Sequence, residues 1–380
     1  MKALACLAVL ALAACGTTTP AAARHSPTAS QAAVSPSQGL ETPSAGATAS
    51  PTASPTAGPT VIPPPVPASG TYGVLVTQPA GGIYSVSIVA NTGRLMAHGE
   101  QSALPQPTCG GAAAAVVPYP VSTSNNAVYA EDSYGHITRI SLDAGALTVT
   151  TVPAASASRR SMFAVSPDDK RIAVVVDDFT STGANTSLYV ENLDGTGRAD
   201  IFSESGAYTI WPVGWHGQSL VVAKAPACTQ GGGPLCCGPQ EFHVVNPASG
   251  VRLATIGGSG CTIAGPPSLA GVLCENTGID FIVYDWSNAL KVQEPSGLSS
   301  QSAAFLSPNG QHIAVSDGTT TRLAYENGTY QLVACGWIDD NHLLAGGNAQ
   351  TQPRIATVPG GQITPVATQG DCAGRIPGGL

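Results

Sequence analysis

Residues 163–174 read FAVSPDDKRIAV, and residues 304–315 repeat this pattern as AFLSPNGQHIAV. In each copy an apolar run leads into Ser-Pro and an Asp or Asn, and an Ile-Ala-Val run follows. Proline presets φ for a turn, and Asp, Asn and Gly tolerate the backbone conformations that complete it. Each copy therefore predicts two short strands joined by a tight turn. The second copy begins 141 residues after the first (304 against 163), about three units of roughly 45 residues.

A second pair of similar segments follows the two copies of this pattern, one after each copy. Trp215 follows a glycine and precedes the apolar run 220–222, and Trp337 follows a glycine and precedes the run 343–345. Elsewhere in residues 70–380 the apolar residues also form short runs separated by Gly, Pro, Asn and Asp, without a helical period over ten or more residues. Short strands with regular turn signals predict an all-β fold, and internal repeats of this length favour a β-propeller.

The Ser-Pro-Asp/Asn-Gly hairpin with its following Ile-Ala-Val strand resembles the repeat of TolB-type, WD-like β-propellers. Asp169 departs from that pattern, because it stands where glycine is usual. The resemblance implies a fold more than an activity. Units of roughly 44 residues then predict a single propeller of seven four-stranded blades, with six or eight left open. The expected blades lie near residues 71–108, 112–153, 160–205, 209–258, 264–297, 302–334 and 335–368.

The first residues predict export. Met1 and Lys2 precede an uncharged apolar run over residues 3–14, which is shorter than the roughly 20 residues of a membrane-spanning helix and typical of a secretory signal. Residues 12–16 read LAACG and resemble the lipobox of bacterial lipoproteins. The resemblance implies a signal peptide over 1–14 and a lipid on Cys15 that anchors the chain to the outer face of a membrane. The alternative is an ordinary secretion signal with a chance cysteine.

Residues 15–69 differ in composition from the rest of the chain. After Cys15 they are rich in Ala, Pro, Ser and Thr, with Arg24 and Glu41 as the only formal charges and no aromatic residue. Such a segment cannot bury enough apolar surface to offset its ordering entropy. We therefore expect a disordered, partly extended linker between the anchor and a propeller domain over residues 70–380.

The cysteines of the predicted propeller indicate disulfides, because an even number outside the cytosol is typical of a disulfide framework. The sequence leaves the pairing open and weakly favours Cys261–Cys274. Cys236 and Cys237 are expected to have different partners, since adjacent side chains of an extended chain point in opposite directions. The eight candidates are Cys109, Cys228, Cys236, Cys237, Cys261, Cys274, Cys335 and Cys372.

No local motif predicts catalysis, a metal or a cofactor. The seven histidines form no His-Glu-x-x-His pattern, and no Cys/His group has zinc-ligand spacing. The segment 257–261 ends in Cys where a nucleophile elbow needs Gly. A net charge of −8 argues against nucleic acid as a partner.

Acidic residues recur just after the second strand of the expected blades. If the register is right, these positions lie on one rim of the ring, and we hypothesise an acidic mouth that binds a cation or a basic ligand. The alternative is that these residues cap hairpins. Trp215 and Trp337 are interpreted as blade core rather than as ligand platforms. The acidic positions are Glu131, Asp132, Asp177, Asp178, Glu275 and Asp317.

Two classes of function agree with these patterns. The preferred one is a non-enzymatic binding or scaffolding propeller at the cell surface, whose partner is a protein, a glycan or a small ligand. The alternative is a propeller hydrolase or lyase whose catalytic residues come from different blades and meet in the central channel. A cluster of acid, His or Arg in the channel would favour the enzyme, and an apolar channel would favour the binding protein.

Overall fold

The computed structural model describes residues 71–380 apart from 111–112, 143–144, 230–237, 260, 277–279, 296–302, 325, 327, 349 and 374–379. Cys15, the linker, Cys236 and Cys237 therefore lie outside the described residues. All regular elements in the described part are β-strands. No helix in that part is long and apolar enough to cross a membrane.

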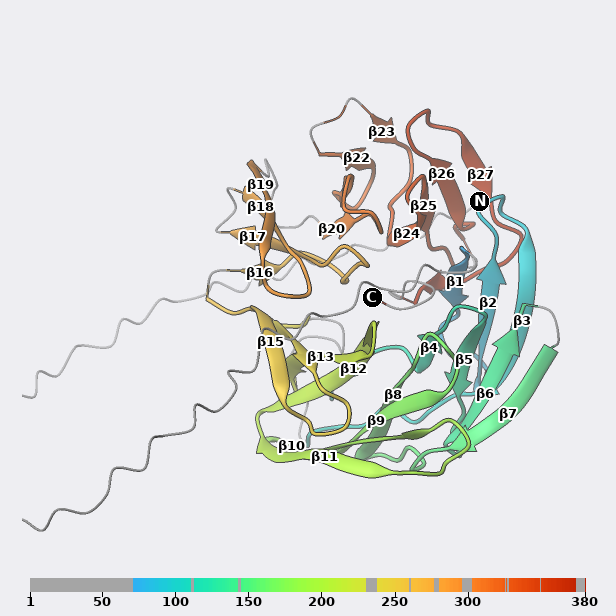
Figure 1. The fold of residues 1–380 in the computed structure, drawn as a ribbon. Helices are drawn as coiled ribbons and strands as arrows, with labels where there is room; N and C mark the ends of the chain where they lie inside the picture. Colours follow the sequence, from blue (N-terminus) through green and yellow to red (C-terminus); the bar gives the residue numbers. More distant parts are fainter. Residues whose placement is uncertain are drawn as a thin grey trace, which may run out of the picture. The chain divides into compact units, whose positions relative to one another are not determined.

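Seven four-stranded antiparallel sheets form a ring, so the fold is the predicted seven-bladed β-propeller (Figure 1). From the innermost strand outward, the first three blades are β28 (Asp371–Cys372), β1 (Gly73–Val76), β2 (Ile83–Val89) and β3 (Leu95–Ser102); β4 (Val121–Thr123), β5 (Ala127–Glu131), β6 (His136–Ser141) and β7 (Gly145–Thr151); and β8 (Arg159–Val165), β9 (Arg171–Thr180), β10 (Gly183–Asn192) and β11 (Ala199–Gly206).

The same order holds in the other four blades. Blade 4 is β12 (Tyr208–His216), β13 (Ser219–Pro226), β14 (Glu241–Val245) and β15 (Arg252–Gly257), and blade 5 is β16 (Thr262–Ile263), β17 (Val272–Asn276), β18 (Asp280–Tyr284) and β19 (Leu290–Pro295). Blade 6 is β20 (Ala303–Leu306), β21 (Ile313–Ser316), β22 (Thr321–Leu323) and β23 (Thr329–Tyr330), and blade 7 is β24 (Gly336–Asp339), β25 (His342–Ala345), β26 (Arg354–Thr357) and β27 (Ile363–Pro365).

The ring closes through blade 1, which takes its innermost strand from the far end of the chain. In β28, Cys372 lies opposite Leu75 and Asp371 opposite Val76. The expected blade 1, residues 71–108, did not include this strand. Two residues are too few to show an alternating pattern, so the closure depends on the ring bringing residues 371–372 beside β1.

The repeated hairpin has the same geometry in both copies. Ser166 Oγ accepts a hydrogen bond from the backbone N–H of Arg171 at 2.9 Å, and Ser307 Oγ accepts one from His312 at 2.9 Å. Gly310 has a φ of 76°, and Asp169, which replaces glycine in the other copy, has a φ of 60°. The hairpin thus keeps a left-handed backbone at this position with either residue, since Asp tolerates this conformation better than most L-residues.

The core lies between neighbouring blades. Met162 and Ala164 of blade 3, for example, pack in one buried cluster with Ile210, Trp215 and Val222 of blade 4. Each sheet therefore buries both faces, which explains the almost continuous apolar runs of its inner strands. Both Trp215 and Trp337 are buried, as expected of core residues.

Three disulfides link the described cysteines. Cys261–Cys274 lies within blade 5 and is the pair that the sequence favoured. Cys335–Cys372 joins the segment before β24 to β28. Cys109–Cys228 joins the segment between blades 1 and 2 to the end of blade 4's second strand, across 119 residues.

Candidate functional site

The six acidic residues lie on or just after four second strands, namely β5, β9, β17 and β21. Asp177 and Asp178 lie within β9, and the other four lie at or near the ends of their strands. Their environments differ. Asp132 and Asp317 accept hydrogen bonds from backbone N–H groups of their own hairpins. Asp178 lies in an exposed ion pair, whereas Asp177 and Glu131 are fully buried. Glu275 is half-buried on β17, opposite Thr262 and Phe281.

Asp132 and Asp317 act as hairpin caps. Asp132 Oδ1 accepts hydrogen bonds from the backbone N–H groups of Tyr134 and His136, both at 2.9 Å. Asp317 Oδ1 accepts them from Thr319 at 2.9 Å and from Thr320 at 2.8 Å. These backbone bonds hold the pKa of Asp317 well below its usual range. Local turn chemistry accounts for these two acids, which is the alternative that the sequence left open.

Asp178 pairs with a cation on the neighbouring strand. Its carboxylate meets the Arg159 guanidinium through two contacts, Nε–Oδ1 at 2.8 Å and Nη2–Oδ2 at 3.0 Å. Both side chains are 45% exposed, so solvent screens the pair and its contribution to stability is small.

Asp177 is buried below a cavity between blades 3 and 4. Thr186 Oγ1 donates to its Oδ1 at 2.6 Å, and Thr209 Oγ1 donates to its Oδ2 at 2.5 Å. Burial raises the pKa of Asp177 to about 6, although the two threonine hydrogen bonds oppose the shift. Both threonines also line the cavity, so their hydrogen bonds to Asp177 fix the orientation of two lining side chains.

This cavity between blades 3 and 4 has a volume of about 310 Å³. Its apolar wall includes Leu188, Phe202, Ile210 and Val222, which come from both blades. A group of polar side chains shares the cavity with this wall: Glu204, Tyr208, Lys224, Glu241, His243 and Arg252. The cavity thus has a mixed lining, in which an apolar wall faces converging polar groups that could orient a small ligand.

Glu241 organises the polar side of the cavity. Its Oε2 lies 2.9 Å from His243 Nε2, and its Oε1 lies 3.5 Å from Lys224 Nζ. The hydrogen bond from His243 lowers the pKa of Glu241, whereas burial lowers the pKa of His243. At neutral pH a neutral His243 therefore donates its Nε2–H to the Glu241 carboxylate. Lys224 Nζ also lies 4.9 Å from the ring centre of Tyr208, which is 48% exposed at the cavity.

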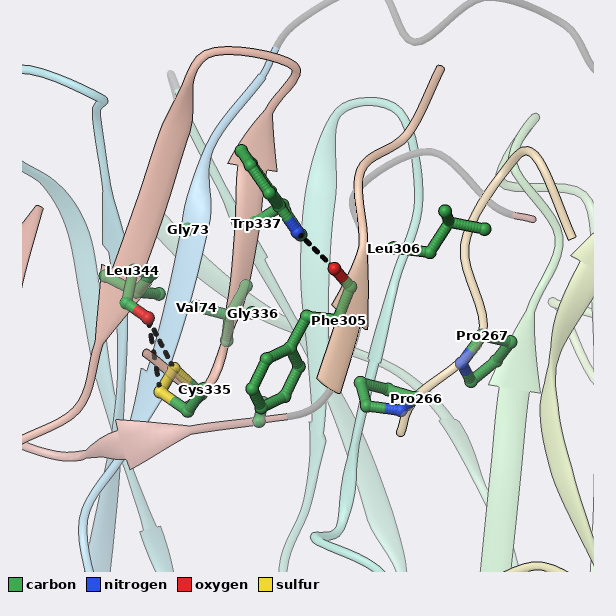
Figure 2. Close-up of a pocket in the computed structure, with 12 residues that line it drawn as sticks. Gly73, Val74, Pro266, Pro267, Phe305, Leu306, Cys335, Gly336, Trp337 and Leu344 are labelled. Carbon is green, nitrogen blue, oxygen red and sulfur yellow. Dashed lines mark hydrogen bonds between the residues drawn. A yellow bond between two sulfur atoms is a disulfide. The ribbon is translucent and has the colours of Figure 1, made fainter. Parts of the chain in front are cut away.

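A small hollow of about 20 Å³ lies beside the inner strands of blades 1, 6 and 7. Figure 2 shows residues that line it, among them Phe305 and Leu306 of β20 and Gly336 and Trp337 of β24. The Cys335–Cys372 disulfide also belongs to the lining. None of the described residues that line this hollow is charged. Nor do the described residues include a group of three or more His, Cys, Asp or Glu arranged to hold a metal.

The sequence singled out Asp177 only as a rim acid, whereas the structure places it buried next to the larger cavity, which the sequence did not predict. Glu241 and His243 are two residues apart, so alternation along β14 places both on one face. Lys224 comes from β13 and Tyr208 from β12, and the apolar wall comes partly from blade 3. No local pattern in the sequence joins these residues, because the packing of two blades brings them together.

No family model and no curated protein matches the chain. A TolB-like protein from Agrobacterium tumefaciens is 13% identical, with a TM-score of 0.37 over 68% of this chain and 84% of that one. KlAtg21, solved with the coiled coil of AgAtg16, is 15% identical, with a TM-score of 0.45 over 68% and 83%. The C-terminal WD40 domain of Sif2 is 10% identical, with a TM-score of 0.39 over 69% and 75%. Similarity at this level does not indicate a ligand or an activity.

Proposed function

We propose that this protein is a binding protein that a lipid anchors to the outer face of a membrane. Its propeller holds a short peptide segment in the cavity between blades 3 and 4. The observation that carries the proposal is the cavity itself, in which an apolar wall stands beside a preorganised Lys224–Glu241–His243 cluster. A propeller on a long linker would present such a cavity away from the lipid surface.

The composition of the cavity favours a peptide. Its wall of Leu188, Phe202 and Ile210 suits one apolar side chain. Its charged groups are of both signs, with Lys224 and Arg252 near Glu204 and Glu241. A backbone amide next to an apolar side chain supplies both a donor and an acceptor, so it can meet both signs without burying a net charge.

Two observations support binding rather than catalysis. The small hollow beside the inner strands of blades 1, 6 and 7 has no charged residue in its lining, which is consistent with binding. In the larger cavity, Glu241 already engages His243 and Lys224. A general base must be within hydrogen-bond reach of a substrate proton, and here the strongest hydrogen bond of Glu241 is used within the cluster.

A peptide-binding assay tests the cavity. Calorimetry of the full chain with acetylated tripeptides that carry a central Leu or Phe should give saturable heat. Lys224→Met should weaken the binding roughly tenfold, because an ammonium–carbonyl hydrogen bond is lost. Lys291→Met is the matched control, since this lysine pairs with Asp285 on blade 5. Equal affinities for wild type and Lys224→Met would contradict the proposed site.

The anchor requires a separate test. Incorporation of radiolabelled lipid should be lost in a Cys15→Ala variant, and that variant should move from the membrane fraction to the soluble fraction. Label that persists in Cys15→Ala would overturn the anchor while leaving the peptide site untouched.

A further inference from the structure

A second cavity, of about 150 Å³, lies between blade 1 and the segment that leads to blade 2. Val76 and Tyr84 come from blade 1, and Leu104, Val117 and Tyr119 come from the connecting segment. The lining also includes Arg160, which belongs to β8 of blade 3. The cavity therefore combines an apolar wall with one strong cation.

Arg160 is a charged side chain that is buried without a counter-ion. It is 5% exposed, and its Nε is buried without a hydrogen-bond partner. No described carboxylate lies close enough to form an ion pair with it. A guanidinium presents a planar fork of N–H donors that matches a carboxylate, and leaving such a group unpaired away from water is unfavourable.

Glu131 is the acid that could neutralise Arg160, but it does not reach it. The side chain of Glu131 is fully buried, and neither carboxyl oxygen has a hydrogen-bond partner among the described residues. The Tyr84 hydroxyl donates to the backbone carbonyl of Glu131, at 2.5 Å, and not to its carboxyl group. Burial raises the pKa of Glu131 to about 8, and nearby Arg160 only partly opposes the shift. At neutral pH Glu131 is therefore mostly protonated, and the charge of Arg160 stays uncompensated.

We propose that this second cavity binds a small organic carboxylate, with the carboxylate on the Arg160 guanidinium and the apolar part against Val76, Leu104 and Val117. A cavity of about 150 Å³ is large enough for a benzene-sized molecule. A bidentate carboxylate would satisfy the donors that Arg160 now leaves unpaired. This site is separate from the proposed peptide cavity and does not depend on it.

The neighbouring acid makes the binding pH-dependent. Four groups are electrostatically coupled to Glu131, namely Arg160, Asp132, Tyr84 and Tyr189. Above pH 8 Glu131 loses its proton and supplies a negative charge near Arg160, so the bound carboxylate is repelled and its affinity falls. Between about pH 6 and pH 8 the affinity should change little, because Arg160 and the ligand carboxylate both stay charged there.

Calorimetry of the full chain with isobutyrate, and with isobutyramide as the uncharged isostere, tests the site. At pH 6.5 we expect saturable binding of isobutyrate and at least roughly tenfold weaker binding of isobutyramide. Arg160→Lys keeps the charge but loses the fork, and should weaken isobutyrate binding roughly tenfold. Glu131→Gln should bind isobutyrate as well as wild type at pH 6.5 and should retain that affinity at pH 9, where wild type weakens.

Three results would overturn the inference. They are no isobutyrate binding to wild type, equal binding of the acid and the amide, or the same loss of affinity at pH 9 in Glu131→Gln as in wild type. The first two need no variant, so a poorly folding Arg160→Lys protein does not leave the question open. Lys224→Met should not alter isobutyrate binding, which separates a failure here from a failure of the peptide site.

Discussion

The indole Nε1 of Trp215 donates a hydrogen bond to the carbonyl oxygen of Ala164, 3.1 Å away, and so joins blade 4 to blade 3. Trp337 repeats this contact between blades 7 and 6, with Phe305 as its acceptor at 3.0 Å. Ala164 and Phe305 hold equivalent positions in the two copies of the repeated hairpin. The repeated hairpin and the repeated Gly-Trp segment therefore contact each other in the same way twice, once between blades 3 and 4 and once between blades 6 and 7.

A residue of the hairpin covers each of these tryptophans. The Arg171 guanidinium lies 4.6 Å from the ring centre of Trp215, and the His312 ring stacks on Trp337 at 6.1 Å. These two residues are also equivalent in the repeat. The hairpin therefore contacts the tryptophan of the next blade through its strand carbonyl and through a side chain near its turn.

Replacing either joint tryptophan should destabilise the propeller. Trp215→Phe or Trp337→Phe leaves a buried carbonyl without its donor and loses packing, so we expect a loss of about 2 kcal/mol in the free energy of unfolding. Urea unfolding followed by circular dichroism measures it. Trp211→Phe is the control, because the buried Trp211 Nε1 has no hydrogen-bond partner in the described part of the chain. A loss as large in Trp211→Phe would show that the hydrogen bond does not matter.

The left-handed residue of the hairpin should resist a side chain that branches at Cβ. Gly310→Val places a β-branched residue at a φ of 76°, with its Cβ about 2.9 Å from that of Ala270, and should cost about 2 kcal/mol or more. Gly206→Val is the comparison, because its φ is not in the left-handed region and no neighbouring atom lies within 4 Å of a built Cβ. Thermal unfolding of both variants measures the loss of stability. Equal losses in Gly310→Val and Gly206→Val would show that the left-handed backbone at Gly310 is not the cause.

Asp177 should make stability depend on pH. Because burial raises its pKa from 3.8 to about 6 in the folded protein, the folded state binds this proton more tightly than the unfolded chain does. Its contribution to stability is therefore fully present below pH 3.8 and is lost as the pH rises through 6, by about 3 kcal/mol in all. The measurement is urea unfolding at pH 4, 5, 6 and 7 in wild type and Asp177→Asn.

In Asp177→Asn this part of the pH dependence should disappear, so the difference between the two proteins should change with pH. Comparing them also cancels the opposite effect of His216 and His243, whose pKa values burial lowers. Asp178→Asn, which removes the exposed pair with Arg159 and a minor contribution to the raised pKa of Asp177, is the matched variant. A constant difference between wild type and Asp177→Asn from pH 4 to 7 would rule out the buried acid as the cause.

The disulfide at the closing strand should stabilise the ring. Removing Cys335–Cys372 as a double alanine variant frees a loop of 37 residues and should lower the free energy of unfolding by about 4 kcal/mol on a chain-entropy estimate. Removing Cys261–Cys274, with a separation of 13, should cost about 3 kcal/mol by the same relation. Hydrogen exchange should also show β1 losing protection only in the first variant. Protection of β1 that is unchanged there would mean that β28 stays paired without the bond.

The sequence by itself determined the local structure and favoured seven blades, with six or eight left open. Short, almost continuous apolar runs specify strands, and the Ser-Pro-Asp/Asn turn specifies a hairpin whose left-handed residue is Asp169 or Gly310. These signals act within a few residues, so they are readable from the chain alone. The repeat spacing then predicts seven blades, as the structure has them.

Only the tertiary structure decided how distant residues meet. Four features join separate segments of the chain: the pairing of β28 with β1, the Cys109–Cys228 bond, the cavity beside Asp177, and the approach of Arg160 to Glu131 without an ion pair. The structure likewise gives the predicted acids different environments: Asp317 caps a hairpin, and Asp177 is buried. The physical reason is that burial and electrostatics depend on which blades pack together, and a strand's own sequence does not carry that information.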